Sequence, residues 1–190
     1  MNMFEKEVTL ACEALRKGKA ILYPTDTIWG LGCDATNNRA VEQLFKIKRK
    51  KEQNSLIALI EATERLRHYL ADVPPIALDL IAYAANPISI IYPNARNLAK
   101  NVLGKDGSVC IRVTNDHFCT ALVKMFDKPI ASTSANFSGE PTALFFEQIS
   151  AELKTKVDHI VNLYHNEIKA AKATTIIRME EGGMFTIVRQ

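Results

Sequence analysis

The chain has 190 residues, of which 47% are hydrophobic and 24% charged, a composition typical of one globular domain with a sizeable core. Its formal net charge of +3 is too small to indicate nucleic-acid binding by itself. No apolar run approaches the ~18 residues of a membrane span, and the first seven residues lack the apolar region of a signal peptide. The four cysteines have no C-x-x-C spacing, so we expect free thiols in a cytoplasmic protein, without a metal site or disulfides.

Hydrophobic periodicity and turn residues predict helices and strands mixed along the chain. The predicted helices cover residues 8–17, 38–48, 64–69, 76–84, 116–126 and 145–153. The predicted strands cover residues 20–23, 28–33, 56–60, 88–92, 108–113, 130–133, 159–162, 174–178 and 184–189. Asn115 is the expected N-cap of the fifth helix, and Gly30 and Gly32 are expected to interrupt the second strand. Hairpin-like and crossover connections together predict an α/β fold with a mixed parallel and antiparallel sheet.

The most informative stretch is the polar run at residues 131–139, ASTSANFSG in one-letter code. Serine and asparagine side chains bond their own backbone and favour caps and turns over helix interiors. Such a run can present hydroxyls, an amide and backbone N–H groups to a polar ligand. A loop with a helix cap explains any one of these residues, but explains all of them together less well.

A second candidate lies at residues 23–35, where Pro24 ends a short apolar strand. Thr25, Asp26 and Thr27 then face the region beyond the strand end, where ligands bind in open α/β sheets. A Ser/Thr turn followed by a glycine-rich bulge accounts for the same residues equally well.

A third candidate is the basic segment at residues 46–55, at the end of a predicted helix. Lys46 and Lys51 there complement the helix dipole. Lys48 and Lys50 are candidates for neutralising phosphate oxygens. The segment is not a Walker P-loop, and no G-x-G-x-x-G motif occurs in the chain.

Arg112 lies within an apolar strand and therefore needs an anionic partner, either an internal carboxylate or the carboxylate of a substrate. The four histidines lie outside all these segments, and the serines of the polar run have no evident base. A covalent serine mechanism is thus weakly supported. The remaining candidates are polar and cationic groups without an evident nucleophile. Such groups suit a reaction between bound substrates, promoted by positioning and charge stabilisation.

Taken together, these segments resemble the YrdC/TsaC family of threonylcarbamoyl-AMP synthases, in its short form with one domain over residues 1–190. The matching pieces are residues 23–27 with 30–32, 48–50, 86–89 with 93, 106–113, and 129–139 with 141–142. They occur in the order of the family and cover nearly the whole chain. The resemblance implies a twisted mixed sheet, open and flanked by helices, around a large basic cavity.

The family condenses L-threonine, bicarbonate or CO₂, and ATP into L-threonylcarbamoyl-adenylate, releasing pyrophosphate. The resemblance therefore implies an ATP-binding nucleotidyltransferase of tRNA processing, whose product reaches adenosine 37 of tRNA through the t6A-transfer machinery. It also implies Mg²⁺ bound through the phosphates rather than in a protein cage. Direct contact with tRNA or double-stranded RNA is a further expectation, and membrane contact is not expected.

The resemblance assigns roles to individual positions of this sequence. The residues implied in threonine binding are Thr27, Arg112, Ser134 and Thr174. Those implied in ATP binding are Lys48, Lys50, Asn54, Ser132, Asn136 and Arg189. The expected catalytic residues are Lys48, Lys50 and Arg112, with Arg112 pairing the threonine carboxylate.

The sequence departs from the family pattern at three positions. Lys50 stands where the family usually has Arg, which keeps the charge but loses the planar fork that matches phosphate oxygens. Ser55 replaces a common Pro, and Trp29 replaces a common Tyr or Val. An alternative is therefore a catalytically weak paralogue acting as an RNA-binding or ribosome- and tRNA-associated protein. Few aromatic residues accompany the basic segment, so base stacking is poorly supported.

Overall fold

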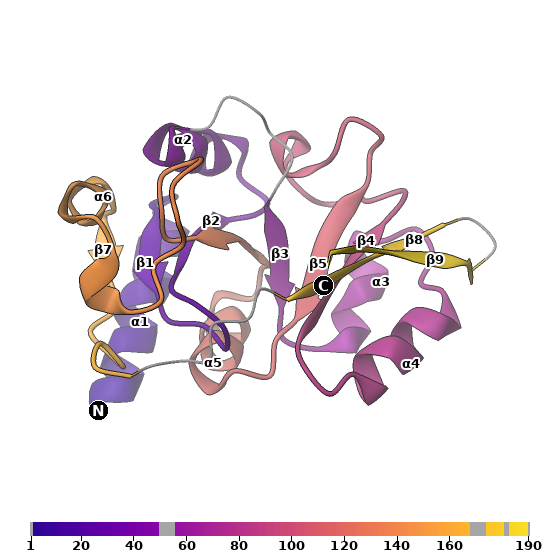
Figure 1. Cartoon of the computed structure of the whole chain (residues 1–190), viewed down its shortest axis with the longest axis horizontal. Helices are drawn as coiled ribbons and strands as arrows, with labels where there is room; N and C mark the ends of the chain where they lie inside the picture. The colour runs from indigo at the N-terminus through magenta and orange to yellow at the C-terminus, as the bar shows by residue number, and fades with distance from the viewer. Residues whose placement is uncertain (1, 50–55, 168–173, 181–182, 190) are drawn as a thin grey trace.

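The computed structural model describes residues 2–49, 56–167, 174–180 and 183–189. Within these ranges, nine strands form one sheet in the order β7-β1-β2-β6-β3-β5-β4-β8-β9 (Figure 1). The strands are β1 (Ile21–Tyr23), β2 (Gly30–Asp34), β3 (Ile57–Ile60), β4 (Ile88–Tyr92), β5 (Val109–Val113), β6 (Ile130–Ser134), β7 (His159–Ile160), β8 (Thr175–Met179) and β9 (Phe185–Arg189). Three neighbouring pairs are parallel and five antiparallel, so the predicted mixed sheet is confirmed.

Six α-helices and three short 3₁₀ turns flank this sheet in the described part of the chain. The helices are α1 (Met3–Arg16), α2 (Asn38–Lys48), α3 (Leu66–Tyr69), α4 (Pro75–Tyr83), α5 (His117–Phe126) and α6 (Ala151–Lys156). The 3₁₀ turns are η1 (Thr63–Arg65), η2 (Lys100–Val102) and η3 (Phe146–Gln148). None of these helices is both long and apolar enough to cross a membrane.

The sheet buries apolar side chains on both faces, because alternate residues of a strand point to opposite sides. Ile21, Tyr23 and Leu59 pack with α1 and α5 in one core cluster. Their neighbours Leu22 and Ala58 belong to a second, larger cluster that includes the inner face of α2. Buried on both faces, the strands read as continuous apolar runs, which is why the sequence predicted most of them.

Helix boundaries differ from the prediction where caps decide them. The first helix begins at Met3 because Asn2 and Glu5 form a reciprocal capping box. The fifth helix is capped by Asp116, whose carboxylate accepts from the Cys119 N–H at 2.9 Å, so the prediction of Asn115 is wrong. The helix predicted over residues 145–153 is also wrong: η3 ends at Gln148, and Ser150 caps a separate helix, α6.

Gly30 and Gly32 do not interrupt β2, which pairs regularly with β1 on one side and β6 on the other. The two glycines instead leave room for the Tyr23 ring. A Cβ at Gly32 would lie 2.7 Å from both Tyr23 Cε1 and Ile130 Cγ2. The strand is therefore continuous where a break was expected, and the glycines allow a side chain to approach its backbone closely.

Candidate active site

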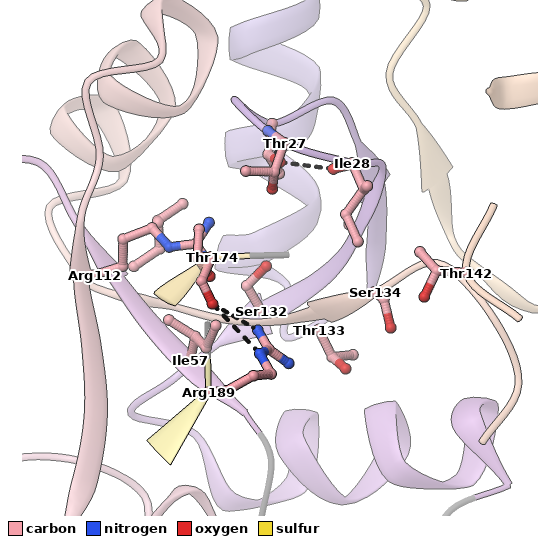
Figure 2. Close-up of a pocket in the computed structure, with 13 residues that line it drawn as sticks. Thr27, Ile28, Ile57, Arg112, Ser132, Thr133, Ser134, Thr142, Thr174 and Arg189 are labelled. Atoms are coloured by element: carbon pink, nitrogen blue, oxygen red, sulfur yellow. Dashed lines mark hydrogen bonds between the residues drawn. The ribbon is translucent and has the colours of Figure 1, made fainter. Parts of the chain in front are cut away.

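A cavity of about 230 Å³ lies over the middle of the sheet (Figure 2). Its lining residue Leu59 belongs to the core cluster with α1 and α5, so the cavity is on that face. The lining residues are Thr25, Thr27, Ile28, Gly30, Ile57, Leu59, Arg112, Ser132, Thr133, Ser134, Thr142, Thr174 and Arg189. Segments distant in the sequence thus meet here, and hydroxyl groups dominate the polar surface.

Six of the residues to which the resemblance assigns a binding role line this cavity: Thr27, Arg112, Ser132, Ser134, Thr174 and Arg189. Lys48 and Asn136 lie behind Ser134 rather than in the lining. Lys50 and Asn54 lie outside the described residues, as does Ser55.

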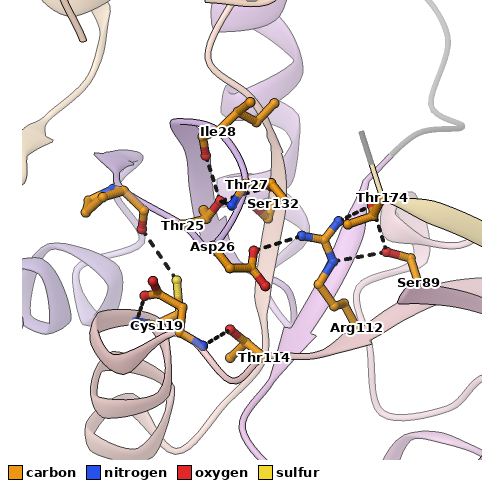
Figure 3. Close-up of polar contacts among 12 residues, drawn as sticks. Thr25, Asp26, Thr27, Ile28, Ser89, Arg112, Thr114, Cys119, Ser132 and Thr174 are labelled. Atoms are coloured by element: carbon orange, nitrogen blue, oxygen red, sulfur yellow. Dashed lines mark hydrogen bonds and ion pairs between the residues drawn. The ribbon is translucent and has the colours of Figure 1, made fainter. Parts of the chain in front are cut away.

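Arg112 is 8% exposed and is held on three sides (Figure 3). Its NH1 group lies 3.3 Å from Asp26 Oδ1, forming an ion pair. Its Nε donates to Ser89 Oγ at 3.1 Å, and its NH2 donates to Thr174 Oγ1. Of the two partners that the sequence left open, the structure therefore contains the internal carboxylate. These three bonds use three of the five guanidinium N–H donors, which leaves two for a ligand.

The loop after β1 is fixed by its own threonines. The buried Thr25 hydroxyl donates to the Ile28 carbonyl oxygen at 2.6 Å and accepts from the Thr27 N–H at 3.2 Å. This Ser/Thr turn directs Asp26 toward Arg112, as Figure 3 shows, while Thr27 lines the cavity. The turn that the sequence offered as one explanation is present, and it places Thr27 at the cavity.

Lys48 ends α2 and is 4% exposed, an unusual burial for a lysine. Its Nζ uses all three N–H donors: it donates to the Ser134 carbonyl oxygen at 2.8 Å, to Asn136 Oδ1 at 2.9 Å and to Ser134 Oγ at 3.4 Å. The Asn136 Nδ2 donates in turn to the Glu140 carbonyl oxygen at 2.6 Å. Lys48 therefore fixes the backbone turn after β6, and a contact with phosphate would require its ammonium to exchange one of these bonds.

Arg49 does not take the place of the family arginine. It adopts a left-handed conformation with φ 53° at the end of α2. Its guanidinium pairs with Glu152 and lies 4.1 Å from the centre of the Phe137 ring. Arg49 thus attaches the end of α2 to α6 and to the polar loop.

Several residues near the site were not identified from the sequence. Ser89 bonds Arg112 from the neighbouring strand β4, and its signal was a polar residue within an apolar strand. Thr142 and Ile57 also line the cavity; Thr142 lies in the matched residues 141–142, but the sequence assigned neither residue a role. Tyr23 reaches Ser132 from two strands away, a contact that only the strand order reveals.

A second cavity of about 300 Å³ adjoins the N-terminal end of β5. Leu56, Ile91 and Val102 give it an apolar wall, and the ion pair of Arg178 with Asp106 closes one side at 3.1 Å. Cys110 also lines it, but burial raises the pKa of this thiol to about 12, so the thiolate needed for a nucleophile is scarce.

The fold is that of a known family. The model described as telomere recombination, Sua5/YciO/YrdC, matches residues 13–190, and the chain belongs to this family. A Pseudoalteromonas translucida protein named threonylcarbamoyl-AMP synthase is 32% identical over 161 residues, covering 83% of this chain and 86% of the relative.

Two solved structures are close in fold. Escherichia coli YciO has a TM-score of 0.83 at 25% identity, covering 96% of this chain and 88% of that one. Pyrococcus abyssi Sua5 complexed with L-threonine has a TM-score of 0.81 at 24% identity. That match covers 96% of this chain but 53% of the Pyrococcus protein, so the present chain spans about half of it.

Proposed function

We propose that this chain is an L-threonylcarbamoyladenylate synthase, which condenses L-threonine, bicarbonate or CO₂, and ATP into threonylcarbamoyl-AMP and pyrophosphate. The observation that carries the proposal is the buried Arg112, held by Asp26 inside a cavity lined with hydroxyl groups. Membership of the family and the naming of its relatives support the same reaction.

Threonine is assigned to the first cavity. We assign the two remaining N–H donors of Arg112 to the threonine carboxylate, because a guanidinium binds such a group with two parallel hydrogen bonds. Thr27, Ser134 and Thr174 offer hydroxyls to the ammonium and the side-chain hydroxyl of the substrate. This cavity of about 230 Å³ is smaller than the ~300–1,000 Å³ pockets of larger ligands, so the nucleotide must extend beyond it.

We assign the nucleotide to the border between the two cavities. Arg189 and Ser132 line the first cavity and can donate to phosphate oxygens, with Lys50 and Asn54 as further proposed contacts. The apolar wall of the second cavity suits a purine ring. The lining of the first cavity includes no carboxylate among the described residues, so Mg²⁺ would arrive as the MgATP substrate, bound to phosphates.

The reaction then follows from placing the substrates together. The uncharged threonine amine adds to the carbon of CO₂ and gives up a proton to solvent, forming a carbamate; when bicarbonate is the source, a water molecule leaves instead. A carbamate oxygen attacks the α-phosphorus, so that a new P–O bond forms while the bond to the β-phosphate oxygen breaks and pyrophosphate leaves. Arg112 orients the amine through the carboxylate, and the cationic groups stabilise charge on the leaving group.

The product is a mixed anhydride, reactive toward amines, so a second protein must transfer it rapidly. We propose the t6A-transfer machinery acting on tRNA as the consumer, in the cytoplasm. The alternative of an inactive RNA-binding paralogue predicts RNA binding that weakens steeply with salt, together with no affinity for ATP.

The test is pyrophosphate release by the purified chain in the presence of MgATP, L-threonine and bicarbonate. We expect release to require all three, and to fall to background when threonine or bicarbonate is left out. Release that is independent of threonine would overturn the proposal, and so would the absence of release from protein shown to be folded.

A further inference from the structure

One buried contact beneath the cavity has no place in the reaction described above. Tyr23 is the last residue of β1, and its side chain is completely buried. Its hydroxyl donates to Ser132 Oγ at 2.6 Å. Ser132 is on β6, with β2 lying between the two strands, so the tyrosine ring spans a whole strand to reach the floor of the cavity.

The intervening strand is built to let the ring pass. Tyr23 is paired with Gly30, and Gly32 is paired with Ser132. A Cβ at Gly32 would lie 2.7 Å from the ring, and one at Gly30 would lie 3.2 Å from the ring and 3.3 Å from Ser132 Oγ. Any side chain at these two positions would compete with the ring for space.

The contact determines what the serine can offer a ligand. A serine hydroxyl has one hydrogen to donate and two lone pairs to accept with. The Tyr23 hydrogen occupies one lone pair of Ser132, so the serine hydrogen must point elsewhere, and Ser132 lines the cavity. Burial raises the pKa of Tyr23, so the phenol keeps the proton that it donates to Ser132.

We propose that Tyr23 is a positioning residue that holds the Ser132 hydroxyl as a hydrogen-bond donor toward a phosphate oxygen of the nucleotide. Gly30 and Gly32 serve the same purpose by giving the tyrosine ring its path across β2. The inference rests on the proposed function, since it deepens the assignment of Ser132 to ATP. Tyr23 and Gly32 would form a second layer of the site, behind Ser132, and neither would contact the ligand.

The test is ATP binding by Tyr23→Phe, which keeps the ring and removes one oxygen. We expect the dissociation constant for MgATP, measured by calorimetry, to rise about fivefold, the effect of losing one oriented hydrogen bond. The dissociation constant for threonine should stay within twofold of the wild-type value, because the contacts of Arg112 are unchanged. Equal ATP affinity in wild type and Tyr23→Phe would overturn the inference.

Tyr92→Phe is the matched control. Tyr92 is equally buried, but it belongs to the opposite core cluster and its hydroxyl has no hydrogen-bond partner among the described residues. Removing this oxygen should leave ATP affinity unchanged. A loss equal to that of Tyr23→Phe would show that any buried hydroxyl matters and would overturn the positioning role.

A double-mutant cycle tests whether Tyr23 acts through Ser132. Ser132→Ala should weaken ATP binding by at least as much as Tyr23→Phe, and adding Tyr23→Phe to Ser132→Ala should then change nothing. Additive losses would contradict the inference, as would unchanged ATP affinity in Ser132→Ala. If the wild-type chain bound no ATP, the proposed function would fail together with this inference. If the wild-type chain bound ATP and the variants bound it with the same dissociation constant, this inference alone would fail.

Discussion

Arg112 shows how one side chain can be both structural and available. Its charge is balanced by Asp26, and Ser89 holds the guanidinium from the next strand. Leaving such a buried cation unpaired would be costly, so the internal carboxylate makes the arginine tolerable before any substrate arrives. If the two uncommitted N–H groups bind the threonine carboxylate as proposed, the guanidinium is already held in place by its other contacts, which would lower the cost of binding.

At this residue we predict that Arg112→Lys raises the threonine KM by roughly tenfold or more while changing the ATP KM little. A lysine keeps the charge but cannot bond Ser89 and a carboxylate in one plane. Initial rates of pyrophosphate release measure both constants. Arg65→Lys, at a partly exposed pair with Glu61 outside the cavity lining, is the control. An unchanged threonine KM would remove Arg112 from carboxylate binding.

A second residue prediction concerns Gly32→Ala, which we expect to lower the free energy of unfolding by roughly 1–3 kcal/mol. The new methyl would lie 2.7 Å from both Tyr23 and Ile130, each packed in the core. Gly30→Ala is the control, with its nearest contact at 3.2 Å, and should cost less. Urea unfolding midpoints at constant m-value compare the two. Equal costs would contradict the account of the ring crossing β2.

At the scale of elements, the sequence predicted those helices and strands whose formation depends on residues close together in the chain. The strand at residues 88–92 matches β4, and the helix at residues 38–48 matches α2. The helix predicted over residues 145–153 failed because its apolar spacing continued across Ser150, a side chain that caps α6 instead. The glycines of β2 were misread as a break because what requires them is the Tyr23 ring, which comes from a different strand.

The residues of the site likewise divide into those that the local sequence indicates and those whose contacts depend on the fold. Arg112 and the polar run of β6 could be predicted because an arginine in an apolar strand and clustered hydroxyls are visible locally. The contacts of Arg112 with Asp26 and of Tyr23 with Ser132 depend on strand order across 86 and 109 residues. No local pattern encodes that order, so the second layer of the site required the structure.

An element-scale prediction concerns β7, where His159 lies 3.6 Å from Glu7 of α1. Burial lowers the pKa of His159 below its ordinary value of 6.5, and Glu7 only partly opposes this shift. Below pH 6.5 the unfolded chain takes up a proton that the folded chain resists. Stability should therefore fall as the pH drops from about 7 through 6.5, until the folded-state pKa is passed.

His159→Gln should remove this part of the pH dependence. Free energies of unfolding in urea, measured for both proteins between pH 7.5 and 5, compare the slopes. Parallel curves for wild type and variant would contradict the prediction.

At the scale of the whole molecule, the cavity collects residues from both ends of the sequence. Thr27 follows β1, Arg112 is in β5 beside the central strand β3, and Arg189 ends β9 and bonds the Thr174 carbonyl oxygen at 3.1 Å. A ligand that contacts all of them links strands across most of the sheet. Binding should therefore stabilise the molecule as a unit.

We predict that MgATP with threonine, each at a hundred times its dissociation constant, raises the melting temperature by about 10–20 °C, because the two ligands contribute equally. One ligand at this excess contributes about 2.7 kcal/mol, and each kcal/mol corresponds to roughly 2–4 °C at this size. Differential scanning calorimetry measures the shift. In Arg112→Lys the part due to threonine should be lost. A full shift in that variant would contradict the assignment.

The central claim is tested most directly by following the carbon of ¹³C-bicarbonate. Pyrophosphate release alone would also accompany formation of threonyl-adenylate, in which bicarbonate has no part. The account predicts a nucleotide product containing threonine, AMP and the ¹³C label, formed in equal amount with pyrophosphate and detected by mass spectrometry. Pyrophosphate with an unlabelled adenylate, or with no adenylate of threonine, would contradict it.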